Sequence, residues 1–238
     1  MRRRSGRRSA FLLVAILALM GGGLFAAATY VPPFYKQAEF ESDQIEFGSE
    51  SSRLMTRVND LSNDITAKPE WGATFEAREL NCFLHEYASE VNARLGGHIH
   101  TPRMSFNGDR VQLGVRSGNG FFSLIFCIEL LVWLVKSEPN CLAVEISSIK
   151  AGLIPIAGQS ILDRVTEAAR ASNVDVAWYR NNGKPVGIFR LFTDQSRRQP
   201  KQIRAVQIRE GQLTIAGRTA PEGTTAPAGV DPLFGGRD

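Results

Sequence analysis

The sequence predicts an α+β protein in which a long-stranded, curved antiparallel sheet packs against about three helices. Three windows carry apolar residues at helical spacing, and about eight short segments carry the apolar patterns of strands. Turn dipeptides at Asn107-Gly108, Asn182-Gly183 and Glu210-Gly211 separate neighbouring strand segments. Such turns favour hairpins, so the predicted strands pair antiparallel.

The first 31 residues predict a membrane anchor. Residues 1–8 carry five Arg and form a basic cytoplasmic tag, and residues 9–31 contain no charged side chain. About 20 apolar residues cross the hydrocarbon layer as a helix, so residues 9–31 predict a single-pass transmembrane helix. The Arg cluster favours an N-terminus inside the cytoplasmic membrane and the remaining chain outside it. The alternative is a secreted protein, with a signal peptide cleaved near Ala28.

The rest of the chain divides by composition. Residues 32–48 predict a polar stalk, residues 49–219 one extracytoplasmic α+β domain, and residues 220–238 a disordered tail rich in Pro, Gly and Thr. The net charge of +4 comes from the tag, because residues 9–238 sum to −1. The basic pI therefore does not indicate nucleic-acid binding, and we expect no nucleic-acid partner.

Three soluble helices are predicted. The first covers residues 49–65, and the second begins at Thr74 and ends at Gly96-Gly97. The third begins at Ser160, with Asp163 as its capping-box partner.

The segment Phe121–Lys136 predicts an unusually long strand, about 50 Å at the usual rise per residue. Its even-numbered positions from 122 to 134 are apolar, and its odd-numbered positions are largely so. Three interpretations of this second apolar face remain open: ordinary core under helices, an apolar groove for a ligand's acyl chain, or pairing of the strand edge with a partner chain. The candidate ligand-binding residues on it are Ile125, Leu131, Trp133 and Val135.

An odd-length turn at residues 138–140 would join this strand to the next one with their apolar faces aligned. That register places Leu134 opposite Val144, and it separates Cys127 from Cys141 by about 33 Å. A disulfide requires Cα atoms within about 7 Å, so we expect no bridge in this hairpin.

Charge is segregated along the chain. Residues 39–92 have a net charge of −8 and residues 180–218 a net charge of +7. The two regions either attract each other or form solvated faces, or the basic one docks on an anionic surface. The candidate residues for anionic-surface contact are Arg190, Arg197, Arg198, Lys201 and Arg204.

No catalytic constellation is recognised. Residues Ser147–Lys150 match the S-x-x-K pattern, but positions three apart on a strand point to opposite faces, and K-T-G is absent. His85-Glu86 begins a zincin motif that fails at Ser89, and the pair at His98 and His100 lacks further histidines. We therefore expect a non-enzymatic protein with no cofactor and no metal.

Two segments resemble a known family. Residues 74–81 are similar to the "F-T-x-x-E-L-N" helix start of YpmS-like, membrane-anchored extracytoplasmic proteins, and residues 144–156 to their strand with a G-x-x-P end. The resemblance spans roughly residues 71–217. It implies an envelope location and association with lipid, and it carries no catalytic residues.

Together these features predict a membrane-anchored envelope protein whose domain binds an amphiphile or a membrane surface. The lipid bilayer is the expected partner, together with an amphiphilic ligand. The alternative is a scaffold or assembly module of an envelope protein complex, which contacts its partner through the long strand's edge or the acidic helices.

Overall fold

A computed structural model describes residues 4–38, 47–88, 99–118, 120, 123–172, 174–192 and 200–220, with side chains from residue 16 onward in the first helix. The helices are α1 (Arg4–Ala28), α2 (Pro33–Gln37), α3 (Phe47–Ala67), α4 (Ala77–Glu86) and α6 (Gln159–Ala171). The strands are β1 (Glu70–Glu76), β2 (Ile99–Asn107), β3 (Arg110–Ser117), β4 (Leu124–Leu134), β5 (Cys141–Ala151), β6 (Ile154–Pro155), β7 (Asp175–Asn181), β8 (Lys184–Arg190), β9 (Lys201–Arg209) and β10 (Gln212–Thr219).

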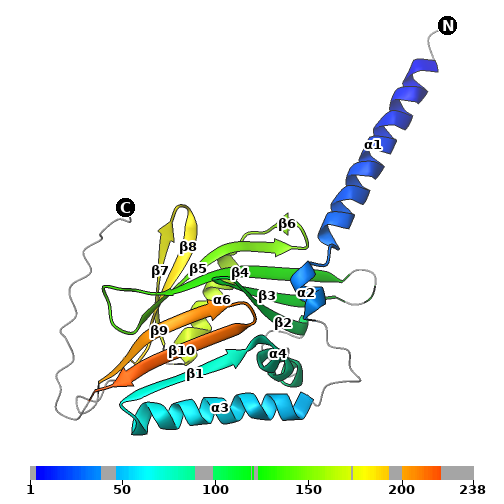
Figure 1. Ribbon diagram of the computed structural model, residues 1–238. Helices are drawn as coiled ribbons and strands as arrows, with labels where there is room; N and C mark the ends of the chain where they lie inside the picture. Colours follow the sequence, from blue (N-terminus) through cyan, green and yellow to red (C-terminus); the bar gives the residue numbers. More distant parts are fainter. Residues whose placement is uncertain are drawn as a thin grey trace.

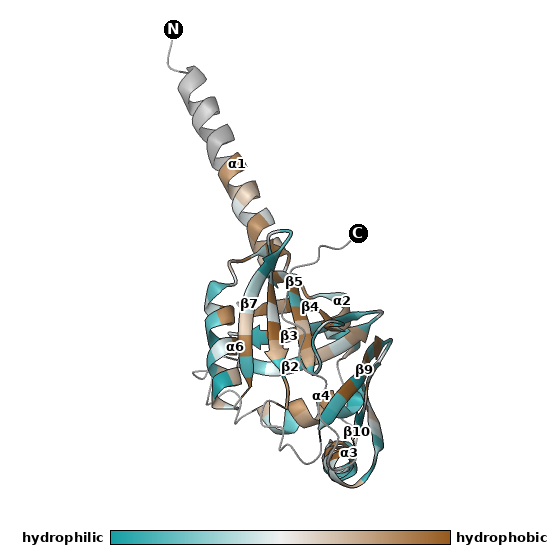
Figure 2. Ribbon diagram, turned by 90° about the vertical axis from the view of Figure 1, so that its left-hand side faces the viewer, coloured by the Kyte–Doolittle hydropathy of each residue, from teal (hydrophilic) through white to brown (hydrophobic). Residues whose placement is uncertain are grey.

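The strands form two antiparallel sheets. The larger sheet has the order β2-β3-β4-β5-β8-β7, with β6 added to β5, and the smaller one has the order β1-β10-β9. The predicted α+β class with a large antiparallel sheet is therefore confirmed. Helices α2 and α6 lie on opposite sides of the larger sheet, and α3 lies at the end of the molecule remote from α1 (Figures 1 and 2).

The turn dipeptides form the predicted hairpins, and the sequence analysis missed two strands, β1 and the two-residue β6. The chain around Thr74 was predicted to begin a helix, yet it pairs with β10, where the hydroxyls of Thr74 and Thr214 lie 2.9 Å apart. Helix α4 begins three residues later, where Glu76 and Glu79 form a capping box. The predicted end of this helix at Gly96-Gly97 lies outside the described residues.

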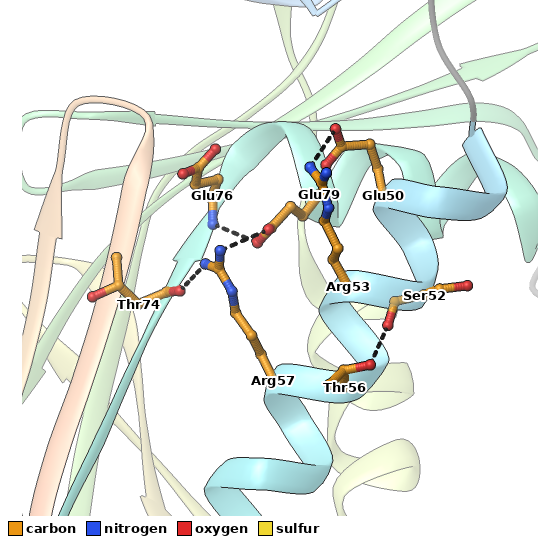
Figure 3. A network of polar contacts seen from close by, with 8 residues as sticks. All are labelled: Glu50, Ser52, Arg53, Thr56, Arg57, Thr74, Glu76 and Glu79. Carbon is orange, nitrogen blue, oxygen red and sulfur yellow. Dashed lines mark hydrogen bonds and ion pairs between the residues drawn. The ribbon is translucent and has the colours of Figure 1, made fainter.

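An ion pair between the half-exposed Arg57 and the buried Glu79 joins α3, β1 and α4 (Figure 3). Arg57 donates a hydrogen bond to the carbonyl of Thr74 at 2.6 Å, and its other terminal nitrogen lies 3.1 Å from Glu79 Oε1. Glu79 is only 2% exposed, so its charge has to be compensated inside the protein. Arg57 does this, together with a hydrogen bond that Glu79 accepts from the N–H of Glu76. The network therefore fixes the packing of the two helices.

Strand β4 is shorter than predicted and lies inside the sheet. It pairs with β3 on one side and β5 on the other, so both of its edges are occupied. The interpretation in which this strand's edge pairs with a partner chain is therefore wrong. The turn to β5 has an odd length, as predicted, but it spans residues 136–140 and sets Leu134 opposite Leu142 rather than Val144.

A bulge at Ser147 then shifts the β4–β5 register by one residue. It sets Glu129 opposite Ser148 and Cys127 opposite Lys150, whereas the predicted pairing of Leu134 with Val144 would have set Cys127 opposite Ala151. All three cysteines are free, which confirms the absence of a disulfide in this hairpin.

Asn140 connects the two sheets. Its backbone has a positive φ of 61°, and its side-chain amide accepts a hydrogen bond from the N–H of Ile203 at 2.9 Å and donates one to the carbonyl of Lys201 at 2.8 Å. The amide thus pairs with β9 as another strand would.

Helix α6 begins one residue before the predicted start at Ser160. Its N-cap is Gly158, and Asp163 accepts a hydrogen bond from the side chain of Gln159 at 3.1 Å, so the predicted capping box is absent. Trp178 of β7 donates to Thr166 Oγ at 2.7 Å, which holds the helix against the sheet.

Helix α1 extends away from the domain (Figure 1). Large apolar side chains on its described part are exposed, among them Leu19 at 76% and Leu24 at 63%. Among the residues that the structure describes, we find no helix with the length and apolar character needed to cross a membrane. The side chains of residues 9–15, which begin the predicted span, lie outside those residues, so the anchor stays a prediction.

Candidate functional site

The segment after α1 packs on the larger sheet. Tyr35 of α2 is fully buried, and its ring lies directly over Gly114 of β3. A side chain at position 114 would leave no room for that ring, because a Cβ there would meet the ring at 2.6 Å. The structure therefore differs from the predicted stalk of residues 32–48, since its first part belongs to the folded domain.

Tyr35 is held by groups from β2. Its hydroxyl donates to the carbonyl of Thr101 at 2.7 Å, at an irregularity in β2 where Thr101 has a φ of 43°. The guanidinium of Arg103 lies 4.4 Å from the ring centroid and donates to the backbone carbonyl of Tyr35 at 2.6 Å. These contacts fix the position of α2 on this face of the sheet.

The end of α1 is attached to the turn between β5 and β6. The N–H of Leu153 donates to the carbonyl of Ala27 at 2.9 Å, and the N–H of Gly152 donates to the carbonyl of Ile125 at 2.8 Å. Gly152 has a φ of 57°, and a Cβ at this position would collide with the carbonyls of Ala27 and Ala28. A glycine is therefore required where the helix meets the sheet.

A cleft of about 400 Å³ lies beneath this attachment, and we call it the helix-base cleft. One wall is the segment from Tyr30 to Gln37, and the other is the face of strands β2 to β5 that carries Tyr35. Its volume falls in the range of small-molecule sites, roughly 300–1,000 Å³.

The strand register arranges the polar part of the cleft in two rows. Gly114, Cys127 and Lys150 form one row beside α2, and Gln112, Glu129 and Ser148 form the next row, further from α1. The bulge at Ser147 is what places Ser148 and Lys150 on this face together with Cys127 and Glu129. The apolar part comes mainly from Tyr30, Pro32, Pro33, Phe34 and Leu153.

Of the charged side chains that line the cleft, Lys150 is available to bind a ligand. Glu129 is bound by Arg110 through a hydrogen-bonded ion pair. Lys150 is exposed, and within the described residues no carboxylate pairs with it. Burial raises the pKa of the Cys127 thiol to about 11, although the charge of Lys150 acts to lower it. The cleft can therefore offer an ammonium group and neutral hydrogen-bonding groups to a ligand.

The predicted apolar site residues lie on the same face as the cleft but do not line it. Ile125 is 2% exposed and its carbonyl accepts the N–H of Gly152, so it is core beneath the end of α1. Leu131 and Trp133 are half-buried further along β4, and Val135, also half-buried, follows the end of this strand. On β4, the part of this face that lines the cleft is at Cys127 and Glu129, between the predicted residues Ile125 and Leu131.

Of the predicted basic residues, Arg190 lies at the other end of the larger sheet. Arg190 faces Cys141 at the start of β5, about ten residues or 33 Å along the strand from the attachment of α1. It forms ion pairs with Asp175 at 3.3 Å and Glu138 at 3.8 Å. Lys201 is half-buried and Arg204 is exposed on β9, whereas Arg197 and Arg198 lie outside the described residues.

The catalytic patterns weighed from the sequence do not assemble into a site. Ser147 Oγ donates to Glu145 at 3.3 Å, and Lys184 lies 3.0 Å from the same carboxylate, so Ser147 and Lys150 have different surroundings. His100 lies on β2, and His98 is outside the described residues. In the described part of the chain, no group of three or more potential metal ligands is found.

Comparisons of this chain with protein-family models, with curated proteins and with solved structures find no match. The functional interpretation therefore depends on the geometry of the chain itself.

Sequence reasoning missed the wall formed by residues 30–37. A signal for it was present, because Tyr30, Phe34 and Tyr35 follow directly on the apolar segment and interrupt the polar composition expected of a stalk. Aromatic residues at such a position pack on a neighbouring surface or lie at a membrane interface.

Proposed function

We propose that this protein is a non-enzymatic, single-pass membrane protein whose extracytoplasmic domain holds the polar end of a membrane lipid in the helix-base cleft. The observation that carries the proposal is the position of the cleft. The residues that follow α1 form one of its walls, and the N–H of Leu153 attaches its other wall to Ala27. With α1 in a bilayer, the cleft lies beside the lipid headgroups.

The anchor itself is supported by the uncharged stretch of residues 9–31 and by the exposed apolar side chains on α1. Burying such side chains in lipid is favourable by about 25 cal/mol per Å². Tyr30, 40% exposed, follows the helix at the level where amphipathic aromatic rings are favoured.

The composition of the cleft suits an amphiphile. The ammonium group of Lys150 can bind a headgroup phosphate, and Ser148 and Gln112 offer neutral hydrogen-bonding groups beside it. Pro32, Pro33 and the other apolar residues of the cleft would contact the carbons next to the headgroup. We therefore expect a preference for anionic lipids, because Glu129 is already neutralised by Arg110.

The alternative function is a scaffold module of an envelope complex, and one of the two contact surfaces expected for it is occupied. The edges of β4 are both paired, so the acidic helices remain as its candidate interface. The resemblance to the YpmS-like family is compatible with the lipid proposal and remains a prediction.

The proposal can be tested by photocrosslinking in membranes. The full chain is reconstituted in phosphatidylcholine vesicles that contain phosphatidylglycerol with a photoreactive headgroup, and the crosslinked peptides are identified by mass spectrometry. We expect crosslinks in residues 30–37 and 148–153. Crosslinks spread evenly over the domain, or their absence, would contradict the proposal.

Two charge reversals provide the matched control. Lys150→Glu should reduce the crosslinks in the cleft, whereas Lys136→Glu should leave them unchanged. Both side chains are exposed and carry the same charge, but Lys136 lies in the turn at the far end of β4. An equal effect of the two variants would show that only the net charge matters.

A further inference from the structure

The turn between β5 and β6 is entirely apolar, and its tip is exposed. From Ala151 to Gly158 the chain reads Ala-Gly-Leu-Ile-Pro-Ile-Ala-Gly, without a polar side chain. Leu153 at its tip is 53% exposed, which makes it one of the few large apolar side chains of the described domain that face solvent. Turns on a solvated surface are normally built from polar residues, glycine and proline.

The depth of this turn is fixed relative to α1. Leu153 donates to the carbonyl of Ala27, which lies four residues before the end of the predicted span at Val31. Ala27 also lies in the last turn of α1, which ends at Ala28. With α1 in a bilayer, the turn therefore lies at the outer interface, where interfacial segments enter lipid by roughly 5–10 Å.

The N–H groups of this turn have hydrogen-bond partners, as a segment that enters lipid requires of its donors. The N–H groups of Gly152, Leu153 and Ile156 donate to Ile125, Ala27 and Ile149 at 2.8, 2.9 and 3.0 Å. Pro155 has no N–H, and Ile154 pairs with Ala151 in the β5–β6 ladder. Unsatisfied backbone groups are what normally exclude irregular loops from lipid.

We propose that the β5–β6 turn is a second membrane contact, inserted beside α1 into the outer interface of the bilayer. This inference rests on the proposed anchor. Two adjacent contacts, one spanning and one inserted, fix the tilt of the domain and keep the helix-base cleft against the headgroups. The contact is made with lipid, because the turn is continuous with the apolar surface of α1 through Ala27 and Tyr30.

The depth of single positions tests this inference. In the full chain, Leu153→Cys, Leu19→Cys and Ser62→Cys are labelled separately with the fluorophore NBD and reconstituted in phosphatidylcholine–phosphatidylglycerol vesicles. Labelling of the unsubstituted chain gives the background, which should be small because Cys82 and Cys141 are buried and burial raises the pKa of Cys127. Ser62 is exposed on α3, remote from α1 (Figure 1).

We expect a lipid nitroxide near the headgroup to quench NBD at position 153, a nitroxide near the chain end to quench it at position 19, and neither to quench it at position 62. A label at 153 that stays unquenched while the label at 19 is quenched would overturn the inserted turn and leave the anchor standing. A label at 19 that escapes quenching would overturn the anchor, and the inserted turn with it.

Discussion

The N–H of Leu153 donates a hydrogen bond to the carbonyl of Ala27 at 2.9 Å, so the last turn of α1 and the β5–β6 turn are directly joined. The end of α1 is therefore attached to the domain directly and not through a free stalk. The same attachment forms the end of the helix-base cleft nearest α1. It therefore affects both the orientation of the domain and the access of a lipid to the cleft.

Substitution of Gly152 tests this attachment. Gly152→Ala should lower the free energy of unfolding by more than Gly183→Ala does, as measured by urea denaturation of the full chain in detergent. Both glycines have positive φ, at 57° and 79°, which costs a non-glycine residue about 1–2 kcal/mol. Only position 152 is crowded, since its Cβ would meet carbonyls of α1 while position 183 is open. Equal losses would show that the helix end is not packed there.

Truncation tests the role of Tyr35. A chain that begins at residue 37 should be less stable than one that begins at residue 29 by about 3–5 kcal/mol, the usual cost of removing a large buried aromatic side chain. Tyr35 is fully buried and donates to Thr101. Thermal unfolding of the two chains measures the difference. Two similar melting temperatures would mean that residues 29–36 are a dispensable linker.

The amide of Asn140 should stabilise the junction of the two sheets. Asn140→Gly keeps the backbone able to adopt the φ of 61° but removes both hydrogen bonds to β9. Each buried partner left unpaired costs roughly 1–3 kcal/mol, so the variant should unfold at clearly lower urea concentration. A free energy of unfolding equal to that of the unsubstituted chain would contradict the pairing.

The reactivity of Cys127 should report the charge of Lys150. Burial raises the pKa of this thiol to about 11, so alkylation should be slow near neutral pH and accelerate as the pH rises towards that value. Lys150→Glu removes a charge that lowers this pKa, and alkylation should slow further. Lys136→Glu is the control. Identical rates in both variants would place Lys150 away from the thiol.

The same shift predicts a pH dependence of stability. The folded thiol holds its proton more tightly than the unfolded one, whose pKa is near 9.0. The contribution of the protonated Cys127 thiol to the free energy of unfolding is therefore fully present below about pH 9, and it is lost as the pH rises towards 11. Urea denaturation of the unsubstituted chain and of Cys127→Ser over this range should show a steeper decline for the unsubstituted chain. Parallel curves would contradict the raised pKa.

Local patterns in the sequence predicted the hairpins well, because Asn182-Gly183 and similar turns determine chain reversal within a few residues. The helical pattern from Thr74 onward was correct for α4 but extended too far back, since β10 offers residues 70–76 an edge that only the tertiary fold provides. The register of β4 and β5 was two residues off near the turn because neither the five-residue turn nor the bulge at Ser147 has a distinctive local pattern.

The candidate site was harder to predict. Its walls come from residues 30–37 and from strands more than 60 residues further on, and tertiary contacts bring them together, among them the burial of Tyr35 over Gly114 and the attachment of Leu153 to Ala27. The apolar face of β4 was recognised, but periodicity does not show which part of that face a neighbouring segment covers. Ile125 proved to be core, and Cys127, two residues on, faces the cleft.

The most direct test of the account is native mass spectrometry of the full chain, released from detergent micelles that contain phosphatidylglycerol. We expect one lipid bound per chain in the unsubstituted protein and in Lys136→Glu, and a clear loss of that bound lipid in Lys150→Glu. A protein that carries no lipid in any form, or that carries the same amount in all three, would contradict the assignment of the helix-base cleft as a lipid site.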